Sequence, residues 1–129
     1  MPELAQIGVT DDNLICLDRM KTYGLIDELQ EGARLAASIA LRRKLYAGKN
    51  LMTIGSKLNT RWNTSLVDPD TFFRSIIKTM DLCPEDAGIG LRSLIILGLD
   101  FIYTKIKDTD IILIGDIFNE DKKWRTFGE

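Results

Sequence analysis

The chain has no histidine among its 129 residues. Histidine is the usual general base near neutral pH and a common zinc ligand, so its absence excludes Ser-His-Asp and Cys-His catalysis and ordinary structural zinc sites. The two cysteines, Cys16 and Cys83, are too few for a disulfide framework, and each lies in an apolar stretch. We therefore predict two buried free thiols in a reducing compartment, with no metal and no other cofactor.

Nucleotide-binding and targeting motifs are also missing. Gly88-Ile89-Gly90 has neither a preceding strand nor a third glycine, which favours helix packing over a dinucleotide site. The N-terminal residues MPELAQIG lack the basic and apolar regions of a signal peptide. The longest apolar segment, 89–106, contains Arg92 and Asp100, whose charges would be costly in a bilayer. We expect a cytoplasmic protein without a transmembrane helix.

Only a few of the charged residues are candidates for a catalytic or cation-binding role. Asp68-Pro69-Asp70 could bind a cation, but proline beside acids is typical of a helix start, so we interpret both aspartates as caps. Arg34 and Arg92 lie among apolar residues and are predicted to be paired structural ions at an interface. The protein is therefore not expected to be an enzyme.

Charge is segregated along the chain although its net value is only −2. Residues 1–33 carry a net charge of −5 and residues 79–129 a net charge of −4. Residues 34–78 hold nine basic and two acidic residues, a net charge of +7. This asymmetry predicts an anionic partner for the middle of the chain. The alternative is a solvated loop whose charges balance the acidic flanks.

Residues 27–50 predict a central helix around which the chain is organised. Acidic residues at its start and basic residues at its end complement the helix dipole, and Gly48 offers a left-handed stop. Within it, residues 35–41 are apolar on nearly every side, which indicates burial all round. The loop that follows, 47–66, is expected to be ordered and to contain one helical turn.

Three further helices are expected. The first runs from a Thr10 cap to Lys21, the second opens at Asp68, and the third runs from Pro84 to Lys105. The second helix is expected to bury one stripe formed by Phe72, Phe73, Ile76, Ile77 and Met80.

Together these segments predict a mainly α fold in one domain of 129 residues, with about four helices in two pairs and short β or extended ends. The extended ends are residues 4–9 and a C-terminal arm at 108–129. Within this arm, residues 110–118 are expected to form an edge strand, a small hairpin or an arm docked on a neighbour. Because 35–41 and 89–99 are apolar all round, we also expect a homo-oligomer.

Two halves of the chain resemble each other, which indicates an internal repeat of residues 10–46 and 68–107. Each half has a short helix, a tight joint and a longer helix. Chance alignment of two apolar helices is the alternative explanation. The matched residues are Lys21-Thr22 with Lys78-Thr79, Leu25 with Leu82, Glu28 with Glu85, Gly32 with Gly90, Arg34 with Arg92, and Leu41 with Leu99.

Cations and short polar side chains gather where the central helix ends. Cations neutralise phosphate charge, and hydroxyls and amides hydrogen-bond phosphate oxygens, so this segment suits a nucleic-acid backbone with little sequence readout. Trp62 is either a loop anchor or a platform on which a base stacks. The predicted phosphate-binding residues are Arg42, Arg43, Lys44, Lys49, Lys57 and Arg61.

Residues 17–60 contain a helical joint, a helix rich in small residues and a basic loop in succession. The residues concerned are Thr22, Gly24 and Leu25 in the joint, Arg34, Leu35, Ala36, Ser38 and Leu41 in the helix, and 42–57 in the loop. In this order, with Tyr23 inserted in the joint, the segment resembles the DndE family of DNA phosphorothioation proteins. The resemblance implies an all-helical oligomer that binds the DNA backbone without an enzymatic site, beside other proteins of a DNA-modification or defence complex.

Two other functions fit the same residues. The strand–helix–helix order of residues 5–45 resembles a ribbon–helix–helix regulator, in which residues 4–9 would pair between chains. The QIGV segment lacks the basic or amide-rich outward face of such strands. The other alternative is a protein-interaction subunit whose basic loop meets an acidic protein partner.

Overall fold

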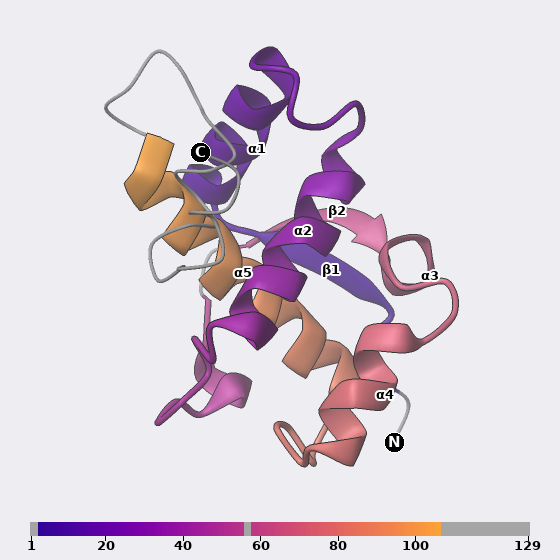
Figure 1. Ribbon diagram of the computed structural model, residues 1–129. Coiled ribbons are helices and arrows are strands. Elements are labelled where there is room, and N and C mark those ends of the chain that lie inside the picture. The colour runs from indigo at the N-terminus through magenta and orange to yellow at the C-terminus, as the bar shows by residue number, and fades with distance from the viewer. Residues whose placement is uncertain (1–2, 56–57, 107–129) are drawn as a thin grey trace, which may run out of the picture.

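A computed structural model describes residues 3–55 and 58–106 (Figure 1). It is mainly helical with a small antiparallel sheet of two strands, in agreement with the expected fold class. The predicted C-terminal arm at 108–129 lies outside the described residues. The elements in order are β1 (Gln6–Val9), α1 (Asp11–Thr22), α2 (Leu29–Arg42), the 3-10 turn η1 (Leu51–Thr53), β2 (Asn59–Asn63), α3 (Thr64–Val67), α4 (Phe72–Thr79) and α5 (Ala87–Ile106).

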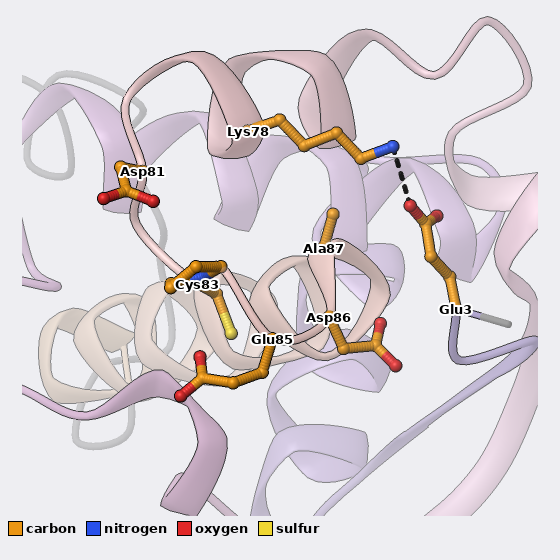
Figure 2. A pocket seen from close by; sticks show the side chains of 8 residues that line it. Glu3, Lys78, Asp81, Cys83, Glu85, Asp86 and Ala87 are labelled. Carbon is orange, nitrogen blue, oxygen red and sulfur yellow. Dashed lines mark ion pairs between the residues drawn. The ribbon is translucent and has the colours of Figure 1, made fainter. Parts of the chain in front are cut away.

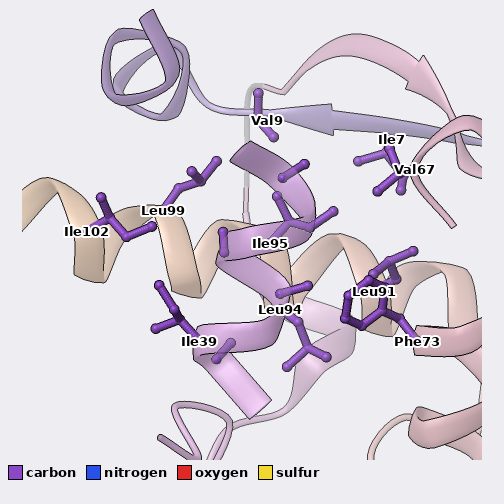
Figure 3. Packing of buried hydrophobic residues seen from close by; sticks show 14 of the residues in the cluster. Ile7, Val9, Ile39, Val67, Phe73, Leu91, Leu94, Ile95, Leu99 and Ile102 are labelled. Atoms are coloured by element: carbon purple, nitrogen blue, oxygen red, sulfur yellow. The ribbon is translucent and has the colours of Figure 1, made fainter. Parts of the chain in front are cut away.

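The central element is α5, not the helix after residue 27. Elements α1, α2, α4, β1 and η1 all pack against it. Its side chains interdigitate with Ile39 of α2 and Ile7 of β1 (Figure 3). By length and composition α5 could cross a membrane, but most of it is buried inside this chain. Its fully buried large residues are Leu91, Leu94, Ile95, Leu99, Ile102 and Ile106.

Small residues allow α2 and α5 to cross at close range. Gly98 of α5 faces the backbone of Ala36, and the neighbouring Ala33, Ala37 and Ala40 are fully buried. The apolar surfaces at 35–41 and 89–99 are therefore largely covered within one chain. A second chain is therefore not needed to cover these surfaces, which was the reason to expect a homo-oligomer. The homo-oligomer stays a prediction.

Local capping explains where α1 and α2 begin. Thr10 accepts a hydrogen bond from the backbone N–H of Asn13, and the Asn13 side chain accepts one from the N–H of Thr10, as a capping box requires. At α2, Glu31 accepts from the backbone N–H groups of Asp27 and Glu28. These two bonds lower the pKa of Glu31. The predicted Thr10 cap is confirmed.

Three helices end in the same backbone motif. In each, a left-handed residue is followed by a leucine whose N–H reaches back to the final helical turn, the hydrogen-bond pattern of a Schellman motif. The left-handed residues are Gly24 after α1, Lys44 after α2 and Asp81 after α4. Gly24 and Asp81 lie at the two joints of the expected internal repeat. The repeat itself stays a prediction. At α2 the stop is Lys44 and not Gly48, so the helix ends earlier than predicted.

The segment before α5 differs from the sequence expectation in two ways. Helix α4 begins at Phe72 rather than at Asp68. Only Phe73 and Ile77 of its predicted stripe are buried, whereas Phe72 and Met80 are exposed. The short helix presents one apolar face to α5 and keeps a second one at the surface. The prediction of one buried stripe was wrong because it merged these two faces.

The strand β2 was not predicted, because residues 59–63 lay inside the expected loop. It pairs antiparallel with β1 of the same chain, with Gln6 opposite Asn63 and Ile7 opposite Trp62. The pairing places Trp62 in the core, where it is 7% exposed. Within the described chain the partner of β1 is therefore β2, and the pairing between chains that a ribbon–helix–helix regulator requires stays a prediction. The expected helical turn does occur, as η1.

Candidate phosphate-binding site

The end of α2 presents consecutive cations to solvent. Arg42 is the last residue of the helix, Arg43 is its C-cap, and Lys44 adopts a left-handed backbone with φ 53°. The Leu45 N–H donates to the carbonyl oxygen of Ala40 at 2.9 Å, which closes the motif. The basic side chains therefore project from a backbone held by helical hydrogen bonds.

Two further turns shape the chain beyond α2. The Ala47 N–H donates to the Lys44 carbonyl oxygen at 3.1 Å, and the Lys49 N–H donates to that of Tyr46 at 3.0 Å. These successive turns keep the chain compact and place exposed Lys49 in the same loop as Lys44. Leu51 then enters the core, where Ser93 of α5 donates to its carbonyl oxygen. The loop is thus anchored at both ends.

An aromatic ring from α5 joins this site. The Arg43 guanidinium lies 4.6 Å from the ring centroid of Phe101, and the Lys105 ammonium lies 5.3 Å from the same centroid. Both distances are in the range of cation–π contacts. The arrangement brings Lys105, which sequence analysis did not select, beside the α2 cations. The spacing of Phe101 and Lys105, four residues apart near a helix end, was the available signal.

We call Arg42, Arg43, Lys44, Lys49 and Lys105 the α2-end cluster. Within residues 3–55 and 58–106, the side chains of Arg42, Lys44 and Lys49 form no ion pair or hydrogen bond, and all three residues are exposed. An anion that approaches them does not have to displace an existing carboxylate from these three cations.

Other cations serve the fold instead. Arg74 pairs with buried Asp68 at 3.0 Å, and Lys78 pairs with Glu3 at 2.8 Å. Arg34 donates to the backbone carbonyl oxygens of Val67 at 3.0 Å and Leu66 at 2.9 Å, so it closes the end of α3. These partners show that three basic residues of the chain are structural.

The prediction that Arg34 and Arg92 are each a paired ion at an interface is wrong for Arg34 and stays a prediction for Arg92. Arg34 binds carbonyl oxygens of its own chain and not an acid at an interface. The Nε atom of Arg92 is buried and has no hydrogen-bond partner in the described part of the chain. Arg34 is therefore satisfied within its own chain and needs no partner from a second one.

Arg61 does not extend the cluster. Arg61 is exposed on β2, which packs against β1 and α3, whereas the cluster lies where α2 meets α5. Figure 1 shows β2 and the loop after α2 on opposite sides of the view. Arg61 also lies where the register of the β1–β2 pairing shifts, between the Ile7–Trp62 pair and the Gly8–Thr60 pair. Lys57 lies outside the described residues.

The aspartates interpreted as caps differ from each other. The buried carboxylate of Asp68 accepts hydrogen bonds from the backbone N–H groups of Phe73 and Arg74 at the start of α4. This confirms Asp68 as a cap. Asp70 is exposed and caps nothing in the regions described. Trp62, buried against β1, is an anchor of the sheet and not a surface for stacking a base.

A cavity of about 320 Å³ opens beside the start of α5 (Figure 2). Glu3, Asp81, Glu85 and Asp86 line it, together with Lys78, which is paired with Glu3. Asp86 is occupied as a cap, because it accepts from the N–H groups of Leu4, Gly88 and Ile89. The excess of carboxylates makes this cavity a poor site for a phosphate.

Comparisons with protein-family models, with curated proteins and with solved structures each return no match for this chain.

Proposed function

We propose that the protein is a non-catalytic DNA-binding component that contacts the phosphate backbone through the α2-end cluster. The observation that carries the proposal is the group of three exposed cations at the anchored end of α2 whose side chains have no partner among the described residues, beside Arg43 and Lys105 on the Phe101 ring. A cluster of this kind neutralises phosphates and reads little sequence, because it offers charge and no groove-shaped set of base contacts.

The exposed side-chain charges, and not the helix dipole, attract an anion here, because the C-terminal end of a helix dipole is negative. Cations at a helix C-terminus are stabilised by the helix dipole, so the cluster costs little to maintain. Its charge acts over about 10 Å at 0.1 M salt, which covers several neighbouring phosphates of a duplex. A role beside other proteins of a DNA-modification or defence complex is supported by the resemblance of residues 17–60 to the DndE family.

The test is the salt dependence of binding to duplexes of unrelated sequence. Arg42→Ala/Lys44→Ala removes two exposed charges that have no structural partner in the described regions. We expect the slope of log affinity against log salt to fall by about 1.8, since each phosphate contact contributes about 0.9. All duplex sequences should be affected alike.

Lys21→Ala/Arg61→Ala is the matched control, because both residues are exposed, form no ion pair or side-chain hydrogen bond within the described residues and lie outside the cluster. This variant has the same net charge and should keep nearly the wild-type slope. Equal losses in the two variants would mean that binding follows net charge and not the cluster. In that case the basic end of α2 would be reassigned to an acidic protein partner.

A further inference from the structure

The C-terminal end of α5 is surrounded by cations from three helices or their ends. Arg19 of α1 donates from Nη1 to the carbonyl oxygen of Ile106 at 3.1 Å. Arg43 and Lys105 both lie over the ring of Phe101, one turn before that end. Leu97, one turn further back on the same face of α5, is half-buried like Phe101. The result is a basic surface with an apolar floor.

An acidic segment follows this surface, between Lys107 and the basic residues at 122–125. Residues 108–121, DTDIILIGDIFNED, contain five acidic and no basic residues, with six large apolar side chains between them.

We propose that Arg19, Arg43, Phe101 and Lys105 form a docking surface for residues 108–121 of the same chain. The carboxylates complement the three cations, and the apolar side chains cover Phe101 and Leu97. The occupant is the chain's own segment because a short tether gives it an effective concentration in the millimolar range, far above that of a second copy.

A consequence for regulation rests on the proposed function. Docking engages Arg43 and Lys105, which belong to the α2-end cluster. The acidic segment and a phosphate backbone therefore compete for the same cations. The segment acts as an internal competitor that weakens DNA binding. It is displaced by a partner, or by an anion that binds the same cations more strongly.

Hydrogen exchange of the full-length chain tests docking without DNA. Backbone amides of residues 110–118 should exchange at least about tenfold more slowly in the wild type than in Arg43→Ala/Lys105→Ala. Lys21→Ala/Arg61→Ala should keep the wild-type protection, and 1 M salt should remove most of it. Circular dichroism confirms that each variant is folded.

Exchange that is the same in all variants would overturn the proposal. Protection that disappears on ~100-fold dilution would also overturn it, because such protection depends on a second copy. Protection that is independent of concentration and lost only in the cluster variant supports docking within the chain.

DNA binding separates the failure of docking from the failure of the proposed function. The variant Asp108→Asn/Asp110→Asn/Asp116→Asn should bind duplex DNA about tenfold more tightly than Asp18→Asn/Asp70→Asn/Glu85→Gln, which changes net charge equally at exposed positions. If neither variant nor the wild type binds DNA at low salt, the proposed function is wrong, while docking is still decided by exchange. If both variants bind equally, the internal competitor is wrong.

Discussion

Gly98 of α5 lies directly against the backbone of Ala36 in α2, so that a Cβ at position 98 would overlap the Ala36 carbonyl oxygen. A backbone atom cannot move aside as a flexible side chain can. The absence of one methyl group therefore sets the distance between the two helices that form the centre of the core.

Gly98→Ala should destabilise the protein by about 1–3 kcal/mol, because overpacking at the helix crossing exceeds the gain in helix propensity. Urea unfolding followed by circular dichroism measures the change. Ser38→Ala, at an exposed position of the same α2, is the control and should stay within about 0.5 kcal/mol of the wild type. A stabilised Gly98→Ala variant would show that α2 and α5 do not approach so closely.

Lys44→Gly should raise stability by about 1 kcal/mol, because Lys44 holds a left-handed backbone that favours glycine. The same change should weaken DNA binding, since it removes a cation of the α2-end cluster. Stability and affinity would then move in opposite directions. Unfolding curves and DNA titrations of one preparation give both values.

The reciprocal change provides the control for Lys44. Gly24 occupies the same place in the motif after α1, with φ 80° and open space where a Cβ would lie. Gly24→Lys should lose about 1 kcal/mol without affecting the cluster. If Lys44→Gly and Gly24→Lys shift stability in the same direction, backbone strain is not the cause.

Asp68→Ala should destabilise the protein by about 3 kcal/mol. The substitution removes the cap of α4 and leaves the partly buried Arg74 with only its longer contact to Glu3, at 3.5 Å. Thermal and urea unfolding measure the loss, and Asp70→Ala serves as the exposed control, expected within about 0.5 kcal/mol. Comparable losses at both positions would contradict the assignment of the cap to Asp68 alone.

The two thiols should react at different rates in the folded protein. Burial, together with the nearby Asp100 carboxylate, raises the pKa of Cys16 to about 12. The reactive thiolate is therefore scarce at pH 8 and grows only as pH approaches that value. Cys83 is also buried, but it lines the cavity beside α5.

We expect an aromatic disulfide reagent at pH 8 to modify Cys83 at least about tenfold faster than Cys16. In denaturant both thiols should react alike. Mass spectrometry of labelled peptides assigns each site. Equal rates in the folded state would show that α1 opens from α5 often enough to expose Cys16.

Local patterns in the sequence were sufficient for part of this structure. The helical class, the Thr10 cap and the burial of both cysteines follow from interactions within a few residues or from side-chain polarity, which any chain with these residues experiences. The cations at the end of α2 were also visible, because consecutive basic residues need no tertiary contact to be recognised. The left-handed stop was misplaced to Gly48, since lysine rarely adopts that backbone.

Tertiary contacts decided the rest. Residues 59–63 become a strand only because β1, fifty or more positions earlier, supplies the backbone partners. Which side of α4 is buried depends on where α5 lies, and a short helix with two apolar faces does not specify that by itself. Arg43 and Lys105 share Phe101 because small residues let α2 and α5 pack closely, whereas Arg61 is carried away on β2. The physical reason is that packing joins residues distant in sequence, and periodicity records only neighbours.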